Sequence, residues 1–290
     1  IYQNNKVEAI APLMLEKQTQ RFQKSISLRF LARADYHNLL FNSEVIAKPE
    51  KTIKKIFSII EENQALWDEI HLTHIDSKNV LAHFLLKSKY NNQFKYLIEN
   101  PFINTTKYLD CSDFTKRCMP SKAKQYANRL KKKTNYSIMV STDDLMDSFS
   151  QLHLAEKAYL TKQGFHNRHS LFENNDKKKF MELISEKGHV LSYYLVDDMN
   201  KMIIYNAGYV LNNIFYSVIT AFEPEYANFG LGRVIYLEMF KENYLNPRWQ
   251  ILDAGTGRYP WKFEWTSNFN LLYQLHYVKP QKSIVKKIIK

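Results

Sequence analysis

Glycine is scarce in this chain, which has only seven glycines among its 290 residues. Two of the seven, Gly230 and Gly232, nevertheless lie one residue apart in "NFGLGRV", after a strand-like run and before a helix-like run. Glycine is favoured where the backbone needs a positive φ or where another group must approach it closely. The pair therefore marks a point at which the backbone has a special task.

Cysteine is scarcer still, since Cys111 and Cys118 are the only two and lack the spacing of a metal knuckle. The pair fits a reducing compartment, so we expect a cytoplasmic protein. No apolar run approaches the roughly 20 residues that a membrane-spanning helix needs. His166 and His169 form an H-x-x-H pair with no evident third ligand, and we expect no metal.

What the sequence does contain is apolar and basic. Hydrophobic residues make up 45% of the chain and aromatic residues 14%, which is ample material for packed cores. The length favours two domains of ordinary size. The net charge of +12 favours anionic partners, namely a phosphorylated cofactor, nucleic acid or an anionic membrane surface. Composition alone does not choose among these three.

The second half of the chain predicts an α/β unit built on an antiparallel meander. Three strand-like runs follow one another with short Asn- or Asp-containing turns between them. A helix follows the glycine pair, and its apolar residues recur at helical spacing up to Pro247. The predicted elements are strand 136–141, helices 142–161 and 174–187, strands 189–196, 201–210 and 214–222, the helix after Gly232, and strands 249–254 and 271–278.

The first half repeats part of this order. A helix with Ile53, Ile56, Phe57 and Ile60 on one face lies among the strand-like runs. The first half reads β-β-α-β-α-β, which resembles the tail of the second-half order, so we predict two copies of one unit, the first lacking its beginning. The predicted elements are strands 7–15 and 26–32, helix 48–63, strand 67–75, helix 77–90 and strand 92–99.

The domain prediction follows from these two copies. A partial first domain covers 1–115, a basic helical connector 116–135, a complete second domain 136–279 and a basic tail 280–290. The connector is either a solvated linker or the phosphate-facing wall of a cleft. The tail is either a frayed terminus or a cationic amphipathic segment that touches an anionic membrane.

The glycine turn has two interpretations. The first amides of a helix lack internal partners and carry the positive end of the dipole, so a glycine turn that opens a helix can bind phosphate. Arg233 adds a charge at this point. The alternative is a helix that packs tightly on a strand. The dinucleotide fingerprint G-x-G-x-x-G is absent from this turn.

The meander, the turn "ANFGLGRV" and the following strand resemble the acyl-CoA-dependent N-acyltransferases of the GNAT superfamily. In that superfamily the turn has a consensus like Gln/Arg-x-x-Gly-x-Gly/Ala and holds the CoA pyrophosphate. Gly230 and Gly232 match the glycines, whereas Ala227 replaces the first Gln/Arg. The first copy has no such glycine turn, so we expect it to bind no pyrophosphate and to close one side of a substrate cleft.

A narrower resemblance covers almost the whole chain. "AFEPEYANFGLGRVIYL" and "LDAGTGRYPWKFEW" are similar to stretches of the cellulose-biosynthesis-type (CelD/BcsL-like) acetyltransferases, a tandem-GNAT group similar in shape to the Fem peptidyltransferases. Asp253, Lys262 and Trp265 keep the family spacing, with Trp261 in place of a tyrosine. The resemblance implies tandem GNAT-like domains, each a mixed, mostly antiparallel twisted sheet flanked by helices.

The resemblance also implies a set of site residues. As co-substrate it implies acetyl-CoA or a longer acyl-CoA, held by Phe229, Gly230, Leu231, Gly232, Arg233 and Val234. For catalysis we expect Lys262 as a cation at the reaction centre, Asp253 or Glu225 as base, and Tyr226 or Tyr259 as the proton donor to thiolate. For the acceptor we expect Gln163, Phe165, Arg168 and Trp261.

The expected function is transfer of an acyl group from acyl-CoA to an amine of a sugar nucleotide, a glycan precursor or a related cell-envelope intermediate. The anionic character of such acceptors suits the basic charge. Two alternatives stay open: a Fem-like transferase that uses aminoacyl-tRNA, and a non-catalytic GNAT-like subunit of a polysaccharide-biosynthesis system.

Overall fold

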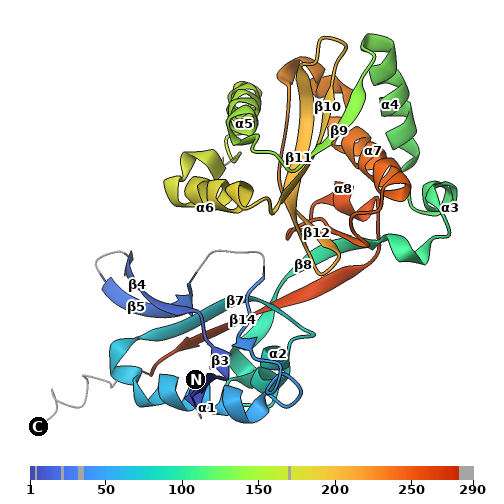
Figure 1. Ribbon diagram of the computed structural model, residues 1–290. Coiled ribbons are helices and arrows are strands. Elements are labelled where there is room, and N and C mark those ends of the chain that lie inside the picture. The colour runs from blue at the N-terminus through green and yellow to red at the C-terminus, as the bar shows by residue number, and fades with distance from the viewer. Residues whose placement is uncertain (4, 21–22, 32–35, 169–170, 281–290) are drawn as a thin grey trace, which may run out of the picture. The chain divides into compact units, whose positions relative to one another are not determined.

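The computed structural model describes residues 1–290 except 4, 21–22, 32–35, 169–170 and 281–290. The chain forms two compact units (Figure 1). The first unit comprises residues 1–100 together with the segment from 270 onward, and the second comprises 101–269. The basic tail predicted at 280–290 lies almost wholly outside the described residues.

The first unit is a sheet with two helices packed on one face. Its main strands follow the order β4-β5-β7-β14-β8, and the short strands β1 and β2, and β3 and β6, pair separately. Helices α1 and α2 enclose a core with these strands. The elements are β1 (Tyr2–Gln3), β2 (Lys6–Val7), β3 (Ala9–Ile10), β4 (Leu13–Gln20), β5 (Gln23–Phe30), β6 (Leu40–Phe41), α1 (Glu50–Glu62), β7 (Glu69–Asp76), α2 (Val80–Leu86), β8 (Phe94–Asn104) and β14 (Phe269–Val278).

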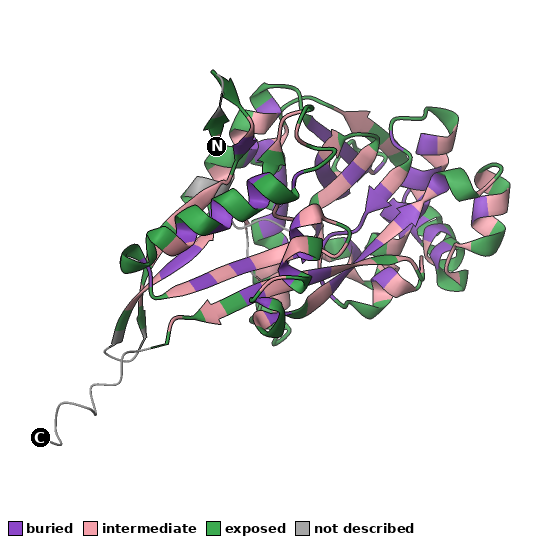
Figure 2. Cartoon of the chain, turned by 90° about the horizontal axis from the view of Figure 1, so that it is seen from below, coloured by how far each residue is buried: buried purple, intermediate pink, exposed green. Residues whose placement is uncertain are grey.

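Helix α1 has the predicted apolar face. Ile53, Ile56, Phe57 and Ile60 are buried in the first core, while the lysines between them are exposed. Residues three and four apart lie on one side of a helix, so this spacing buries a continuous stripe. Figure 2 shows the result, with buried residues on the inner strands and on one side of the helices.

The second unit is a sheet covered by helices on both faces (Figure 1). The strand order is β8-β13-β12-β11-β10-β9, so the meander β10-β11-β12 is antiparallel as predicted. The elements are α3 (Cys111–Arg117), α4 (Ser121–Lys133), β9 (Ser137–Ser141), α5 (Met146–Lys162), α6 (Asn175–Glu186), β10 (Val190–Val196), β11 (Met202–Leu211), β12 (Ile214–Phe222), the 3-10 segment η5 (Pro224–Phe229), α7 (Leu231–Leu245), β13 (Ile251–Asp253) and α8 (Pro260–Phe263).

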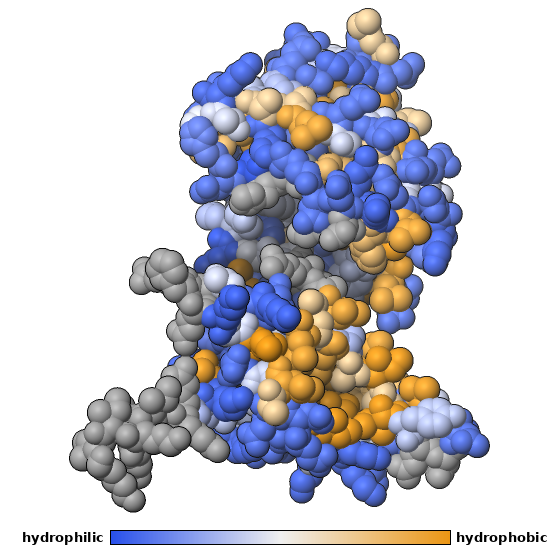
Figure 3. All heavy atoms as spheres, turned by 90° about the vertical axis from the view of Figure 1, so that its left-hand side faces the viewer, coloured by the Kyte–Doolittle hydropathy of each residue, from blue (hydrophilic) through white to orange (hydrophobic). Residues whose placement is uncertain are grey.

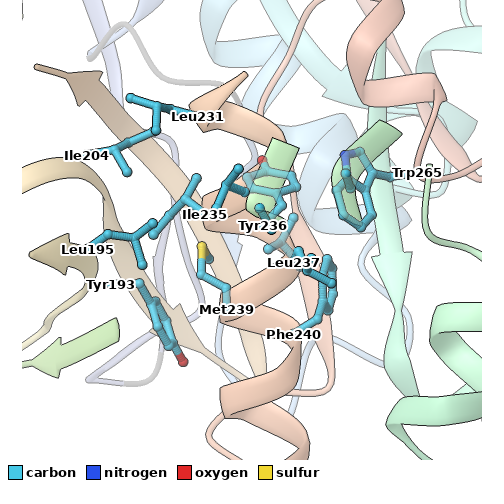
Figure 4. Packing of buried hydrophobic residues seen from close by; sticks show 14 of the residues in the cluster. Tyr193, Leu195, Ile204, Leu231, Ile235, Tyr236, Leu237, Met239, Phe240 and Trp265 are labelled. Atoms are coloured by element: carbon cyan, nitrogen blue, oxygen red, sulfur yellow. The ribbon is translucent and has the colours of Figure 1, made fainter. Parts of the chain in front are cut away.

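Helix α7 is the centre of the larger core of the second unit. Leu231 lies beside Ile204, Ile235 points toward Leu195, and Phe240 lies near Trp265 (Figure 4). Helices α4 and α3 complete this face. On the opposite face, α5 and α6 form a separate core with β10, β11 and β12. The sheet therefore fixes α7 on one side and α5 on the other.

One short parallel pair of strands occurs in each unit. In the second unit β12 pairs in parallel with β13 only from Ile214 to Tyr216, although β12 continues to Phe222. In the first unit β5 pairs in parallel with β7 only at Ser27 and Leu28. Every other pairing described within the two units is antiparallel. The shared arrangement agrees with two copies of one unit.

The observed units have other bounds than the predicted domains. Strand β14, which the sequence analysis placed in the second domain, pairs antiparallel with β7 of the first unit, with Leu275 opposite Leu72. In exchange, the end of β8 joins the second unit, where Phe102 pairs with Asp253. The chain thus crosses between the units within β8 and again at the start of β14.

Several element boundaries also differ from prediction. The helix predicted from Thr142 begins at Met146, where Asp144 accepts the Met146 N–H. The strand predicted over 7–15 is divided among β2, β3 and β4 because Pro12 interrupts it. The connector helix is shorter than 116–135, since Pro120 separates α3 from α4.

Figure 3 shows apolar atoms gathered on one face of the first unit. Large apolar side chains are well exposed at several positions early in that unit, among them Leu31, Leu40 and Ile46. This face is not part of the site developed below, which lies in the second unit. Among the described residues, no helix combines the length and the apolar character needed to cross a bilayer.

Candidate functional site

The site begins where β12 and β13 diverge. Beyond Tyr216, β13 no longer pairs with β12, so this edge of β12 faces no strand in the described structure. On its other side β12 carries a β-bulge, because Ala207 pairs with Ile219 and Gly208 pairs with Ser217, which leaves Val218 as the extra residue. Gly208 is required here, since a Cβ would lie 1.8 Å from the carbonyl oxygen of Tyr216. Bulges often redirect a strand beside a functional site.

From β12 the chain leads through η5 into the glycine turn. Gly230 ends η5 and precedes α7 with φ 60° and ψ 40°, the left-handed conformation that glycine adopts without strain. A Cβ at this position would lie 2.6 Å from the ring of Tyr126 on α4. Gly230 is therefore explained by backbone conformation and by tight packing against α4.

Gly232 differs from Gly230 in that a Cβ there would meet no atom within 4 Å. It lies in the first turn of α7, where no side chain caps the helix. In the described structure the N–H groups of Leu231 and Gly232 have no hydrogen-bond acceptor, whereas those of Arg233 and Val234 bond to the Gly230 carbonyl. The turn therefore presents open backbone donors beside open space, which suits an anion.

The side chains of the turn are already engaged in the protein. Leu231 and Val234 are buried in the core, and Phe229 packs against it. Arg233 forms two hydrogen bonds with Glu264, of 2.7 and 2.6 Å. This pairing raises the pKa of Arg233 and lowers that of Glu264. A ligand at this turn would thus meet backbone amides first, and the Arg233 charge is shared with Glu264.

Asp253 and Lys262 lie at either end of the loop that joins β13 to α8. Asp253 ends β13 and accepts the Gly255 N–H at 2.9 Å. The Lys262 ammonium, on α8, donates to the carbonyls of Gly255 at 2.9 Å and Thr256 at 3.0 Å. Both side chains are buried, at 4% and 6% exposure. The Lys262 ammonium therefore holds the loop that follows Asp253 in place through these two hydrogen bonds.

The sequence analysis missed three polar residues near the same fork. Ser217 on β12 donates to Asn206 of β11 at 3.1 Å and also lies within hydrogen-bonding reach of the Tyr236 hydroxyl on α7. Burial, with the nearby Asp253 charge, raises the pKa of Tyr236. A signal was available for Asn206, because it is a polar residue within the apolar run "MIIYNAGYV". Tyr236 had none, since a tyrosine within an apolar stripe is typical of a core.

The other predicted catalytic residues lie apart from Asp253. Glu225 is exposed in η5 and faces Lys133 at 3.5 Å. The Tyr226 hydroxyl is buried and donates to Asp197 at 3.3 Å, and burial together with Asp197 raises its pKa to about 12. No contact in the described part of the chain joins either residue to Asp253. Tyr259 is exposed before α8, with its ring 5.1 Å from the Lys262 ammonium.

The predicted acceptor residues are dispersed. Gln163 and Phe165 are exposed after α5. Trp261 packs edge-on against Tyr236, with ring centroids 5.4 Å apart. Arg168 instead pairs with the buried Glu156 at 2.6 Å and donates to the Thr220 carbonyl at 2.7 Å. These residues stay predictions as acceptor contacts.

The pair Glu156–Arg168 covers the far end of the free β12 edge. Arg168 binds the Thr220 carbonyl, and the Phe222 N–H hydrogen-bonds to the Glu156 carboxylate. The two side chains thus act there as a neighbouring strand would. Neither β13 nor this pair covers residues 217–219, so the open edge is confined to that short stretch of the described chain.

We expect Arg168→Met to lower the unfolding free energy by about 3–5 kcal/mol at neutral pH, because it leaves a buried carboxylate without its cation. Burial already raises the pKa of Glu156. The Glu156 carboxyl therefore binds a proton more tightly in the folded chain than in the unfolded chain. The unfolding free energy then falls as the pH rises from the unfolded-state pKa of Glu156 to its folded-state pKa. The deficit of the variant should shrink between pH 8 and pH 5 in urea titrations.

Lys157→Met is the control for this prediction, because Lys157 lies next to Glu156 in α5 but pairs with the more exposed Glu173. We expect a change within about 1 kcal/mol for it, with no such pH dependence. If Arg168→Met lost the same unfolding free energy at pH 8 and at pH 5, Arg168 would not be the cation that compensates the buried Glu156 carboxylate.

Metal ligands and thiols add nothing to this site. No group of three or more His, Cys, Asp or Glu residues with metal-binding geometry occurs in the part of the chain that the structure describes. His169 lies outside that part. Cys118 donates to the Trp265 carbonyl, and burial raises the pKa of its thiol. Both cysteines are free thiols.

A family model and several solved structures are similar to this chain. Residues 120–263 match the model of the acetyltransferase (GNAT) domain. L-PGS from Bacillus licheniformis superposes with a TM-score of 0.59 at 11% identity, over 99% of this chain and 86% of that one. FemX superposes with a TM-score of 0.59 at 10% identity, over 100% and 89%. A conserved protein of unknown function from Bacteroides thetaiotaomicron gives 0.56 at 10%, over 93% and 84%.

No curated protein matches the sequence. At such low identity the likeness to solved structures shows the fold alone. The narrower cellulose-biosynthesis-type family stays a prediction. The domain match covers the glycine turn, Asp253 and Lys262. The second unit therefore carries an acetyltransferase domain of the GNAT type, and the chain has the fold of a GNAT-type acyltransferase.

Proposed function

We propose that the second unit transfers an acyl group from acyl-CoA to an amine. The observation that carries this proposal is the combination of a free β12 edge with the open amides of the α7 turn, within one acetyltransferase domain. The turn would hold the pyrophosphate. The pantetheine arm, which is extended and contains two amides, would lie along the open edge at 217–219, since extended chains bind free strand edges through backbone hydrogen bonds.

The chemistry requires no covalent enzyme intermediate. The amine nitrogen attacks the thioester carbonyl carbon, a C–N bond forms and the C–S bond breaks. The amine loses a proton and the departing CoA thiolate gains one, so the step is balanced. Asp253 is the carboxylate at the fork and is the base that we favour over Glu225, which faces Lys133 instead.

Tyr236 and Lys262 have supporting roles in this proposal. The raised pKa keeps the Tyr236 phenol protonated, so it can donate a hydrogen bond near the fork. Lys262 fixes the loop that follows Asp253. Tyr226 is a weaker choice for the proton donor, because its hydroxyl is committed to Asp197.

For the acceptor we propose an anionic amine-bearing molecule, such as a sugar nucleotide, a glycan precursor or a related cell-envelope intermediate. The net charge of +12 supports an anionic partner. A cytoplasmic location, where acyl-CoA is found, belongs to the same proposal. So does contact of the basic tail with the inner face of a membrane.

A calorimetric titration with acetyl-CoA, longer acyl-CoAs and free CoA tests the first step. We expect saturable binding of at least one of them at one site per chain. Absence of binding at every chain length would end this proposal.

Gly232→Ala separates the ligand interpretation of the turn from the packing interpretation. Alanine is the better helix former and meets open space here, so the unfolding free energy should rise by up to about 1 kcal/mol. The same methyl group would occupy the space beside the open amides, and we expect CoA to bind about tenfold more weakly. Unchanged affinity would show that the phosphate does not lie at these amides.

A second candidate is transfer from aminoacyl-tRNA, which the Fem resemblance suggests and the exposed cations of α4 favour. It predicts tRNA binding that weakens steeply with salt, because neutralised phosphates release counterions. The non-catalytic alternative predicts that Asp253→Asn leaves every activity of the chain unchanged.

A further inference from the structure

Helix α4 lies directly against the glycine turn. Its residues Ala123, Ala127 and Leu130 are buried in the core shared with α7. On the neighbouring side of the helix, the Tyr126 ring fills the position that a Gly230 Cβ would take. The turn is therefore built against α4, although the sequence separates the two by about 100 residues.

Arg129 occupies the next position on that side of α4. Its guanidinium carbon lies 5.7 Å from the centroid of the Phe229 ring and 5.8 Å from that of Tyr126. Stacking on two rings holds a guanidinium in place without neutralising it. The Arg129 charge is thus fixed over the residue that immediately precedes Gly230.

The other cations around the turn have carboxylate partners. Arg233 pairs with Glu264, and Lys133 faces Glu225. Within the described ranges of the chain, Arg129 forms no ion pair with a carboxylate, and it is exposed to solvent. An oriented and unneutralised guanidinium beside open backbone donors is suited to a phosphate group.

We propose that Arg129 binds the pyrophosphate of acyl-CoA and thereby replaces the side chain that the turn lacks at Ala227. The inference rests on the proposed function and adds a binding residue from outside the turn. It assigns the basic connector helix to the wall of the phosphate site. Arg129 is assigned to the pyrophosphate rather than to the 3′-phosphate of CoA, because it lies over Phe229, next to the open amides of Leu231 and Gly232.

The test measures binding of CoA and of dephospho-CoA, which lacks only the 3′-phosphate, to the full chain. We expect Arg129→Gln to raise both dissociation constants about tenfold or more, because a charge-assisted contact is lost. Arg129→Lys keeps the charge but not the fork geometry of the guanidinium. Its dissociation constants should therefore lie between those of the unchanged chain and those of Arg129→Gln. The salt dependence of CoA binding should also become shallower in Arg129→Gln.

Lys124→Gln is the matched control, since Lys124 is an exposed cation of the same helix for which no contact with the turn is present. It removes the same charge, and we expect affinity within about twofold of the unchanged chain. Circular dichroism and melting curves establish that each variant is folded, because Arg129 is exposed and its replacement should not unfold α4.

The outcomes are distinct. If the unchanged chain binds CoA and Arg129→Gln binds it equally well, the inference is wrong while the proposed function stands. If only CoA loses affinity and dephospho-CoA does not, Arg129 contacts the 3′-phosphate and the pyrophosphate assignment is overturned. If the unchanged chain binds neither compound, the proposed function fails and the inference fails with it.

Discussion

Replacing Gly208 by alanine should lower the unfolding free energy of the second unit by at least about 3 kcal/mol. A Cβ at this position would lie 1.8 Å from the carbonyl oxygen of Tyr216, 2.8 Å from its carbon and 3.2 Å from the Val218 nitrogen. All three are backbone atoms, so no side chain can move aside. The clash can be relieved only if β12 shifts at its bulge. We expect that shift to cost more free energy than overpacking by a side chain usually does.

The measurement is urea unfolding, followed by tyrosine and tryptophan fluorescence. Gly232→Ala is the matched control, because it adds the same methyl group where no atom lies within 4 Å. We expect the two variants to change stability in opposite directions. Because β12 also forms the free edge, the Gly208→Ala chain should bind CoA weakly even where it is folded. A loss of stability below about 1 kcal/mol would mean that the bulge is not as tight as described.

The sequence predicted the parts of the fold that local chemistry determines. Strand β12 begins and ends at the predicted residues, because "LNN" provides a turn before Ile214 and Pro224 ends the strand at Phe222. The apolar residues at helical spacing after the glycine pair, among them Val234, Leu237 and Phe240, predicted the buried face of α7. The position of the turn between these elements followed from its glycines. Hydrophobic period and turn residues act over a few positions, and so they can be read from the chain.

The parts that escaped prediction depend on contacts between residues far apart in sequence. Strand β14 follows the second domain in sequence, but its Leu275 pairs with Leu72 of the first unit. Nothing in the residues of a strand identifies its partner strand. The same holds for Arg168, which follows α5 in the chain. Its position in the sequence did not indicate Glu156 and Thr220 as its partners.

The two glycines of the turn illustrate both cases together. From the sequence alone, both glycines had the same two possible explanations, close approach of a phosphate or tight packing of the helix on a strand. In the structure, Gly230 is required by a positive φ and by the ring of Tyr126, whereas only Gly232 leaves open space. A glycine in a sequence signals a missing Cβ, but the neighbour that requires its absence is set by tertiary packing.

Replacing Lys262 by methionine should reduce acyl transfer at least about 100-fold while CoA affinity changes less than about threefold. The ammonium is buried and donates to the carbonyls of Gly255 and Thr256 in the loop that follows Asp253. Methionine fills similar space without the donor, so the loop loses two charge-assisted hydrogen bonds. A small displacement of a reacting group is costly, because transfer depends on its position. No described contact joins Lys262 to the amides of the turn.

The assay is release of CoA thiol from acyl-CoA in the presence of a panel of amines, together with calorimetry for affinity. Lys241→Met is the control, since Lys241 pairs with Glu238 about two to three turns into α7. Melting curves separate a positioning role from simple unfolding. Loss of CoA affinity in parallel with turnover would place Lys262 in ligand binding, whereas unchanged turnover would reduce it to a structural lysine. A loss of turnover without a loss of CoA affinity is the result expected if Lys262 holds the loop after Asp253 in the position needed for transfer.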